Sequence, residues 1–384
     1  MGNKPRIRFK GFTEDWEQRK LISLYKTIRN AFVGTATPYY TNDSINGYFY
    51  LESNNVKNGK INRNNEIYIT KDFYQKQEDK LLYKDDIVIV QSGHVGHTAV
   101  IPEELDKTAA HALIMLQNKK ENFDSHFINN SFQTPLIRNK IDEITTGNTI
   151  KHILASDVKN IVINMPSFKE QKLISQLFKL LDLNITLHQC KLEKLKLTKK
   201  ALLQKLFPKN GKHIPEIRFK GFTDAWEQRK LGEFVKIVSG DAPSTFISGN
   251  CIYVKVDDLN YSDRIQLSSS NLVNANPKAH LVNQGATIFP KRGAAIMTNK
   301  VRIMGQDGYL DTNMMALIPE EIDKDFLFTF IQKTGLYKIA DTSTIPQINN
   351  KHIEPYMIQV PSEKEQAYIG VVFEKIDKII TLHQ

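Results

Sequence analysis

Hydrophobic residues recur at alternating steps of four and three from Ser167 to Phe207, a stretch without Gly or Pro. This heptad spacing predicts one long helix with a narrow apolar seam, as in a coiled coil. Ser167 follows a proline and precedes Glu170 by three positions, and this capping box predicts the helix start. The seam positions are Ile174, Phe178, Leu181, Ile185, His188, Leu192, Leu195, Lys199, Leu202 and Leu206.

Outside this stretch the pattern changes to short runs of β-branched and aromatic residues, separated by turn dipeptides such as Asn46-Gly47. These runs predict strands, and longer runs predict helices at 123–139 and 326–339. We therefore expect the α+β class, with a mixed globule on each side of the long helix. The predicted strands are Tyr48–Leu51, Ile67–Ile69, Ile87–Val90, Leu113–Leu116, Ile161–Ile163, Ile252–Val256, Ala286–Phe289 and Met315–Ile318.

Two parts of the chain occur twice. Ile345–Gln384 repeats Ile150–Gln189, so a second helix begins after Pro361 with Phe373, Ile376 and Ile380 at the seam phase. A short lead-in segment, Ile7–Leu21, returns nearly unchanged as Ile217–Leu231. Two copies indicate a duplication and not a solenoid, which needs at least three repeats. Because the ends of each half match while the middles differ, we expect a common frame that carries two globules with different tasks.

The repeats divide the chain into four parts. We expect the first lead-in segment and globule at 1–165, the first long helix at 166–208, a connector with the second lead-in segment and globule at 209–360, and the start of a second helix at 361–384. Residues 190–207 have no counterpart after Gln384. The second helix should therefore be short, and the first should show an uncovered apolar seam around Leu192, Leu195, Leu202 and Leu206. Either the chain is truncated, or another subunit or a second copy covers that seam.

Composition narrows the class of protein. At 384 residues the chain can form two to three domains, and no run approaches 18 apolar residues, so we expect no membrane span. The two cysteines lie in different segments and suit a reducing cytoplasm. The net charge of +10 is concentrated in the long helix and the connector after it. By charge alone, a solvated basic helix face is favoured over DNA contact.

The duplicated segments identify a resemblance. The lead-in sequence Ile-Arg-Phe-Lys-Gly-Phe-Thr followed by Trp-Glu-Gln-Arg-Lys-Leu, and the helix starts Pro166–Gln171 and Pro361–Gln366, resemble the specificity subunit of type I restriction–modification systems. The resemblance covers essentially the whole chain. Gly34–Pro38 and Ser239–Ser244 are similar to the loop that opens a target-recognition domain of that family. Residues 91–93 and 291–293 are similar to its later strand–Gly loop.

The resemblance implies a double-stranded DNA reader without chemistry of its own. Each globule would bind one half of a split target, and two antiparallel coiled-coil helices would hold the globules apart with pseudo-twofold symmetry. Two methyltransferase subunits and two translocase–nuclease subunits would join the complex. S-adenosylmethionine, ATP and Mg²⁺ are then expected only on these partners, and no cofactor on this chain. Subunit-interface candidates are Ile174, Phe178, Leu181, Ile185, Leu192, Leu195, Lys199, Leu202, Leu206, Phe373, Ile376 and Ile380.

Motifs for catalysis are missing from the sequence. It has no Gly-x-x-x-x-Gly-Lys-Ser/Thr loop for ATP, no Gly-x-Gly for a Rossmann-type turn, and no adjacent prolines for an amino-methyltransferase tetrad. Glu170-x-Lys172 matches the tail of a nuclease motif, but we interpret Glu170 as a helix cap. His94 and His97 are too few for a zinc site, so DNA contact or an ordinary surface loop is favoured there. His188 and His383 are interpreted as polar positions that set helix register, and Lys199 as a residue that snorkels or meets a partner.

Loops that combine basic, amide and small residues are the candidates for DNA contact, through phosphate anchoring and base readout. A solvated basic loop is the competing interpretation for each of them. Trp16 and Trp226 recur identically, so we interpret them as scaffold packing and not as base-stacking residues. The candidate DNA-binding residues are Thr35, Tyr39, Ser92, His94, His97 and Lys151 in the first half, and Ser244, Lys291, Arg292, Asn299, Lys300 and Arg302 in the second.

A second function class stays open at this point. The chain could be a coiled-coil assembly scaffold whose globules bind protein, with the basic helices as docking faces. Salt distinguishes the two, because DNA binding weakens steeply with ionic strength while an apolar protein interface does not. A nuclease or methyltransferase acting alone would need an active-site constellation that the sequence lacks.

Overall fold

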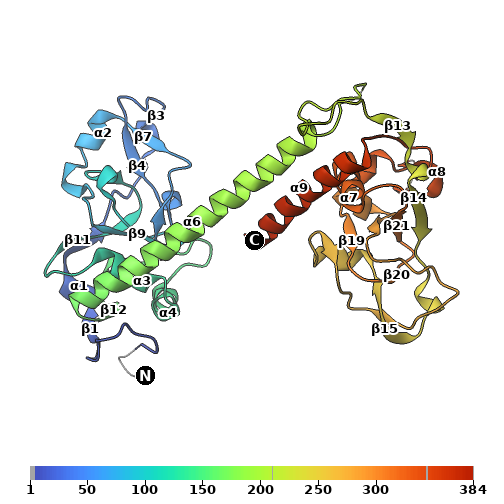
Figure 1. Cartoon of the computed structure of the whole chain (residues 1–384). Helices are drawn as coiled ribbons and strands as arrows, with labels where there is room; N and C mark the ends of the chain where they lie inside the picture. The colour runs from blue at the N-terminus through green and yellow to red at the C-terminus, as the bar shows by residue number, and fades with distance from the viewer. Residues whose placement is uncertain (1–4, 210, 343–344, 384) are drawn as a thin grey trace. The chain divides into compact units, whose positions relative to one another are not determined.

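The chain divides into two compact units, Met1–Ile185 and Thr186–Gln384 (Figure 1). The structure, a computed structural model, describes residues 5–209, 211–342 and 345–383. The long helix α6 (Phe168–Lys205) belongs to both units. Each unit contains its own sheets, helices and buried core, which confirms a mixed α/β protein with two globules.

Unit 1 is built on two four-stranded sheets. In the first, ordered β2-β11-β8-β9, every neighbouring pair is antiparallel, and the buried residues of β8 alternate between two core clusters on its two faces. The second sheet has the order β10-β4-β7-β3. Its strands and those of the first are β2 (Tyr25–Asn30), β3 (Tyr40–Thr41), β4 (Tyr48–Leu51), β7 (Ile67–Ile69), β8 (Ile87–Val90), β9 (Thr98–Val100), β10 (Ala109–Ala110) and β11 (Leu113–Lys119), with a small hairpin of β5 (Val56–Lys57) and β6 (Lys60–Ile61).

Unit 2 repeats this plan with different strands. Its main sheet has the order β14-β21-β18-β19-β16, and a smaller sheet has the order β17-β15-β20. The strands are β14 (Val235–Ser239), β15 (Ser248–Val254), β16 (Ile265–Gln266), β17 (Leu272–Val273), β18 (Thr287–Pro290), β19 (Arg302–Met304), β20 (Gly308–Leu310) and β21 (Met314–Pro319). The shorter helices of the two units are α1 (Leu21–Leu24), α2 (Lys71–Gln75), α3 (Ser125–Phe132), α4 (Pro135–Ile144), α5 (Ala155–Val158), α7 (Lys324–Thr334), α8 (Asn350–Ile353) and α9 (Glu363–Leu382).

Both helical predictions within the globules were too long, for local reasons. The run at 123–139 is divided into α3 and α4 because Pro135 has no N–H to continue the first helix and suits the first position of the second. The run at 326–339 ends at Thr334 because Gly335 turns the backbone with a positive φ of 80°.

The duplicated lead-in segment forms a strand that closes each globule. β1 (Glu17–Lys20) pairs antiparallel with β12 (Val162–Met165), which runs directly into α6. β13 (Glu227–Lys230) pairs in the same way with β22 (Met357–Val360), which leads into α9. The start and the end of each globule are thereby joined, and this pairing explains why the Glu-Gln-Arg-Lys sequence occurs twice.

A buried ion pair fixes each lead-in segment to its helix. The Arg8 guanidinium donates to both Glu170 carboxylate oxygens at 2.7 and 2.8 Å, and Arg218 donates to both oxygens of Glu365 at 2.8 and 2.7 Å. Each glutamate is only 1% exposed. The predicted capping boxes are therefore corrected: Ser167 Oγ accepts weakly from the Glu170 N–H at 3.4 Å, but the carboxylate binds arginine, and Ser362 makes no side-chain cap.

The glutamine after each of these glutamates joins the helix to the globule. Gln171 donates to the Pro166 carbonyl at 2.8 Å and accepts from the Asp124 N–H at 3.0 Å, just before α3. Gln366 makes the equivalent bonds, to the Pro361 carbonyl at 3.0 Å and from the Asp323 N–H at 2.9 Å. The repeated Glu-Gln dipeptide therefore orients both long helices against the globules that precede them.

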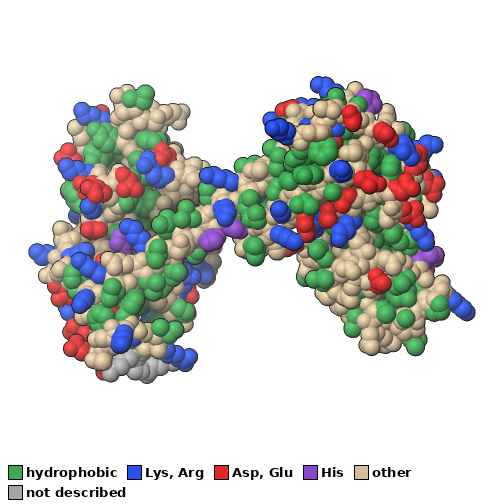
Figure 2. Space-filling view, viewed as in Figure 1, with side chains coloured by type: hydrophobic (Ala, Val, Ile, Leu, Met, Phe, Trp, Pro, Cys, Tyr) green, Lys and Arg blue, Asp and Glu red, His purple; other side chains and the backbone are tan. Residues whose placement is uncertain are grey.

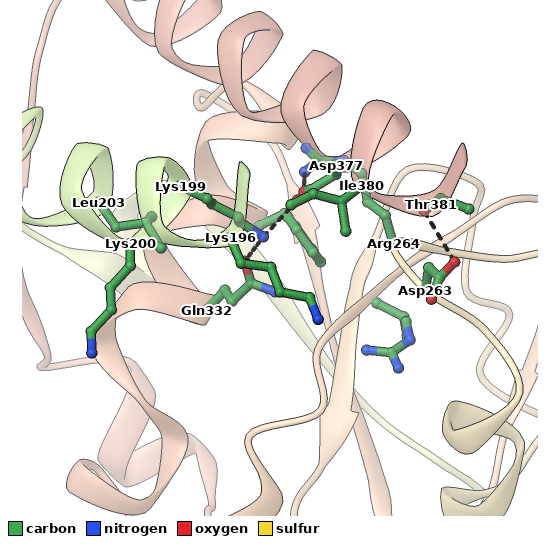
Figure 3. A pocket seen from close by; sticks show the side chains of 12 residues that line it. Lys196, Lys199, Lys200, Leu203, Asp263, Arg264, Gln332, Asp377, Ile380 and Thr381 are labelled. Carbon is green, nitrogen blue, oxygen red and sulfur yellow. Dashed lines mark hydrogen bonds and ion pairs between the residues drawn. The ribbon is translucent and has the colours of Figure 1, made fainter. Parts of the chain in front are cut away.

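Within unit 2, α6 runs antiparallel to α9. The imidazole rings of His188 and His383 lie 5.2 Å apart, and the Lys199 ammonium lies 2.6 Å from the Asp377 carboxylate. Lys199 also donates to Gln332 of α7 at 2.7 Å, so its partners lie within this chain (Figure 3). Lys199 is therefore ion-paired within the chain, and its contact with another subunit stays a prediction.

The expected uncovered seam is only partly present. Leu206 is buried in the core of unit 2, Leu202 packs against that core, and Leu192 and Leu195 are half-buried. The uncovered part lies earlier, where seven large hydrophobic side chains between Leu177 and Leu187 are 43–57% exposed. Figure 2 shows hydrophobic side chains exposed along α6. The heptad pattern predicted which positions of α6 are apolar. The core of unit 2 covers the last of them, Leu202 and Leu206.

Candidate nucleic-acid interface

In each unit, the two loops singled out from the sequence leave the same end of the main sheet. In unit 1, Leu113 of β11 pairs with Val90 of β8, while its carbonyl accepts from the N–H of Ala31, just after β2. The loops at 31–36 and 91–97 therefore begin side by side. In unit 2, Ser239 of β14 and Phe289 of β18 both pair with Met315 of β21, which places the loops at 240–245 and 291–298 together in the same way.

The second of these loops is held by a partner loop, and we call the pair the double loop. In unit 1 it consists of residues 91–94 and 146–153. The Gly93 N–H donates to the Lys151 carbonyl at 3.1 Å, and the Ile153 N–H donates to the Gln91 carbonyl at 3.0 Å. Thr146 and His152 exchange two backbone hydrogen bonds of 2.9 Å, which closes the partner loop.

Unit 2 contains the same backbone pattern with different side chains. Its double loop consists of residues 291–294, 341–342 and 345–348. The Gly293 N–H donates to the Pro346 carbonyl and the Ile348 N–H to the Lys291 carbonyl, both at 2.8 Å, and Asp341 and Gln347 exchange two bonds of 2.9 Å. Gly93 and Gly293 have φ values of 80° and 77°, which favour glycine, and a Cβ on either would meet open space. The glycines are required by the turn and not by crowding.

Four predicted residues of unit 1 meet at its double loop. His94 and Lys151 are exposed, and Ser92 and His97 are half-buried. His97 Nδ1 accepts from the Asn58 N–H at 3.2 Å, which leaves its Nε2 as the donor. Burial, together with the charges of His94, Arg138 and Lys57, lowers the pKa of His97. Arg138 and Lys57 make this part of the surface locally positive, which favours phosphate binding.

Thr35 and Tyr39 lie on the neighbouring loop and have different environments. Thr35 is exposed beside Gly34. One face of the Tyr39 ring is stacked on Phe73, with centroids 4.0 Å apart and planes 5° apart, and the Lys76 ammonium lies 5.9 Å from its centroid. Base stacking by Tyr39 is thereby disfavoured, while its hydroxyl stays available for hydrogen bonding.

A histidine anchors the loop that carries Thr35. His111 Nε2 lies 2.9 Å from the Gly34 carbonyl, and its Nδ1 lies 3.4 Å from a Glu52 carboxylate oxygen. The contact with Glu52 raises the pKa of His111, and the same contact lowers the pKa of Glu52. Tyr40 also donates its hydroxyl to Glu52. The loop position thus depends on a charged pair beneath it.

In unit 2, Arg292 and Ser244 are exposed, whereas Lys291 is half-buried. Burial lowers the pKa of Lys291, and the neighbouring Asp241 and Asp311 oppose this effect. The Arg292 backbone forms a bridge with Gln347 in the double loop, while the residue as a whole is exposed to solvent. Arg292 is the strongest candidate in this unit for a phosphate or guanine contact.

The other three predicted residues of unit 2 are occupied inside the domain. Asn299 has a positive φ of 50°, donates to the Gln332 carbonyl at 2.8 Å and accepts from the Leu336 N–H at 3.0 Å. Arg302 donates to three backbone carbonyls, those of Leu259, Ser262 and Val301, at 2.6–2.8 Å. Lys300 donates to Asn260. Asn299 and Arg302 are therefore structural residues, and the interface that we propose below omits them.

The partner loops, at 146–150 in unit 1 and at 341–342 and 345–347 in unit 2, were missed as sites, apart from the neighbouring Lys151. Their signal was a repeated Thr-Ile dipeptide, Thr149-Ile150 in the first half, whose counterpart ends at Ile345. These isoleucines are 66% and 55% exposed. The tryptophan interpretation is supported: Trp226 is 2% exposed, and Trp16 lies edge-on against Phe127 at 5.8 Å.

Among the described residues, no group of three or more His, Cys, Asp or Glu side chains is arranged to hold a metal ion. His94 and His97 are 6.2 Å apart between ring centroids, without a carboxylate or thiol to complete a site in that part of the chain. Within the described residues, no helix is both long and apolar enough to cross a membrane.

Comparison with known proteins gives a consistent result. The family model for the type I restriction modification DNA specificity domain matches residues 13–197 and 223–384. The chain is 24% identical to the type I restriction enzyme MjaVIII specificity subunit of Methanocaldococcus jannaschii, across 96% of this chain and 88% of that protein. It is 26% identical to the StySPI specificity subunit of Salmonella potsdam, across 83% and 73%. The fold resembles the crystal structure of the type I restriction-modification S subunit from M. genitalium, with a TM-score of 0.63, 15% identity, and 99% and 93% of the two chains covered.

Proposed function

Because the chain belongs to the type I restriction modification DNA specificity family, we propose that it selects the DNA sequence on which a restriction–modification complex acts. Each unit reads one half of a split target through its double loop and the loop beside it. The base contacts come from side chains that differ between the two units, such as His94 and Lys151 in unit 1 and Arg292 in unit 2.

One observation carries this proposal. The double loops have the same backbone hydrogen bonds in both units, while their side chains have diverged. A surface with a constant backbone and changed side chains is what two readers of different sequences need, since position comes from the frame and specificity from the base-contacting groups. A protein-binding scaffold would not require the same loop geometry twice.

The partners follow from the same proposal. Two methyltransferase subunits and two translocase–nuclease subunits bring S-adenosylmethionine, ATP and Mg²⁺, and this chain contributes no catalytic group and no cofactor. We place the complex in the cytoplasm. The contacts of α6 with α9, from the His188–His383 pair to the Lys199–Asp377 pair, support an antiparallel helical spacer. The interface candidates on this spacer that the unit cores leave accessible are the half-buried Ile174, Leu192, Leu195, Ile376 and Ile380 and the exposed Phe178, Leu181 and Ile185.

The test is methylation of DNA by the assembled complex. The chain is co-purified with its cognate methyltransferase subunits, the complex modifies genomic DNA, and the modified sites are sequenced. We expect one split motif with two different halves. The absence of any sequence preference, or DNA binding that does not weaken between low and moderate salt, would contradict the proposal.

A substitution at the double loop assigns one half-site to one unit. Arg292→Ala should weaken binding of the target about 5- to 150-fold, as expected for a contact of roughly 1–3 kcal/mol, and relax specificity in one half only. Arg229→Ala is the matched control, because Arg229 lies on β13 and pairs with Glu233. Equal losses for the two variants would show that Arg292 contributes charge and not readout.

A further inference from the structure

A cavity of unit 2 is lined by lysines and, within the described part of the chain, by no acidic residue. Its volume is about 780 Å³, which is in the range of pockets that bind small molecules. It is bounded by the end of α6, the connector after it, the end of α7 and the paired strands β13 and β22. The lysines are Lys200, Lys209, Lys333 and Lys338. Positive charge is therefore concentrated in a hollow of ligand size.

Lys333, in the last turn of α7, carries a charge that the fold does not fully compensate. It is half-buried, its ammonium lies 5.1 Å from the centroid of the Phe207 ring, and it has no carboxylate partner among the described residues. Burial and the charge of Lys338 both lower the pKa of Lys333. The ring and the helix end offset part of this cost, but two neighbouring ammonium groups still lack a counter-charge. A bound anion would supply one.

The other groups around the cavity add hydrogen-bond donors. Lys200 and Lys338 are exposed to solvent. Lys209 lies 2.9 Å from Glu216, which is not among the lining residues, so its charge is already shared. Gln228 and Gln359, which face each other on β13 and β22, also line the cavity. Ammonium and amide groups both donate, so this lining suits a ligand rich in acceptor oxygens.

The charge at Lys333 is not part of the duplicated frame. α3 and α7 follow the equivalent caps Asp124 and Asp323, whose N–H groups both donate to a glutamine of the long helix. Counted from these caps, Thr134 of unit 1 takes the position of Lys333. The contacts that hold each globule to its helix therefore do not require this lysine, and its role is peculiar to unit 2.

We propose that this cavity binds a compact polyanion, a chain of two or three phosphates, either free or as part of a nucleotide. Lys200, Lys333 and Lys338 bind the phosphate oxygens as point charges, and the glutamine amides donate to the oxygens that remain. DNA is a poorer fit, because a duplex carries its phosphates on its outer surface, whereas lysines around one hollow suit several charges on a small ligand. None of the lining residues belongs to the double loop.

The experiment measures binding of tripolyphosphate, ATP and adenosine to the full chain by isothermal titration calorimetry. We expect saturable binding of tripolyphosphate and ATP, and none of adenosine. Excess Mg²⁺ should weaken the binding, because it neutralises the oxygens that the lysines contact. ATP that binds more tightly than tripolyphosphate would assign the site to a nucleotide, and equal affinities would assign it to the phosphate chain alone; both results support the site.

A pair of variants locates the anion. Lys333→Met keeps the apolar stem and should weaken binding about tenfold or more, as expected for the loss of one charge-assisted contact. Lys351→Met is the matched control, because Lys351 is an exposed lysine of α8 that does not line the cavity. Without ligand, Lys333→Met should keep or raise the melting temperature, since it removes a half-buried ammonium that lacks a counter-charge. Tripolyphosphate should raise the melting temperature of the parent chain more than that of this variant.

Three results would overturn the proposal. Tripolyphosphate that does not bind at millimolar concentration would exclude the site. Equal losses in the Lys333→Met and Lys351→Met variants would place the anion elsewhere on the surface. A Lys333→Met variant that loses affinity for DNA of any sequence, in a chain that ignores tripolyphosphate, would assign these lysines to the DNA backbone. The methylated motif does not depend on this cavity, so failure here leaves the proposed function untouched.

Discussion

A histidine ring placed between two hydrogen-bond acceptors satisfies both only when each ring nitrogen carries a proton. His111 is in this position, because the Gly34 carbonyl cannot donate and the Glu52 carboxylate accepts. The geometry therefore agrees with the raised pKa of His111 and the lowered pKa of Glu52, both caused first by their mutual contact. Through these two contacts, His111 holds the loop at 33–36 against the sheet.

This pair predicts a pH-dependent contribution to stability. The folded-state pKa of His111 is raised, so its contribution is full below the unfolded value of about 6.5 and is lost as pH rises through the folded value. That of Glu52 is lowered, so its contribution is full above about 4.3 and is lost as pH falls through the folded value. His111→Gln should therefore reduce the free energy of unfolding in urea at pH 6 more than at pH 9.

The matched control is His94→Gln, at an exposed position away from this pair. Its effect on the free energy of unfolding should be small at both pH values. A destabilisation by His111→Gln that is equal at pH 6 and pH 9 would mean that packing of the ring, and not its charge, holds the loop.

The sequence could name basic residues but not their environments. Arg292 and Arg302 both looked suitable for DNA, yet Arg302 donates to three backbone carbonyls and Arg292 is exposed. Which arginine a fold needs for its own carbonyls depends on loops that are distant in sequence; here Arg302 reaches Leu259 and Ser262. The partner loops, at 146–150 in unit 1 and at 341–342 and 345–347 in unit 2, were missed for the same reason, because their role arises from pairing with residues far along the chain.

At the scale of the elements, the pattern was a better guide. The strands at 48–51, 67–69 and 87–90 have the predicted bounds, since alternating β-branched and aromatic runs between turn dipeptides leave little ambiguity. The long helix has its predicted extent to within a few residues, because no Gly or Pro interrupts it. A heptad pattern tells which face of a helix is apolar, but it does not tell what covers that face. The sequence therefore predicted an uncovered seam at Leu202 and Leu206, whereas the core of unit 2 covers both residues.

Equivalent substitutions in α9 and α6 should therefore lower the free energy of unfolding by different amounts. Phe373→Ala removes a fully buried ring from the core of unit 2 and should cost about 3–5 kcal/mol. Phe178→Ala, at the same position of the repeat, removes a ring that is 48% exposed and should cost less than about 1 kcal/mol. Urea unfolding of the two variants measures both values. Similar losses would contradict the difference in burial between the two rings.

At the scale of the whole molecule, the duplication separates frame from recognition surface. Arg8–Glu170 and Arg218–Glu365 are equivalent ion pairs, and Gln171 and Gln366 make equivalent bonds to the globules. Both globules are thus attached to their helices by the same contacts. Exchange of one globule for the other should then keep every contact of the frame.

This leads to a prediction about target symmetry. A chimera in which residues 232–360 replace residues 22–165 should fold, because β1 would pair with the incoming β22 as β13 does, and the ion pair of Arg8 with Glu170 would be kept. With the same reader in both positions, and with the proposed pseudo-twofold arrangement, the methylated motif should become an inverted repeat of the half-site that unit 2 reads. Sequencing of DNA modified by the chimera with its methyltransferase subunits measures this. The reciprocal chimera is the control and should give an inverted repeat of the other half-site. A chimera that assembles but still marks the original asymmetric motif would show that the first half-site is not read by the globule of unit 1, since that globule would be absent.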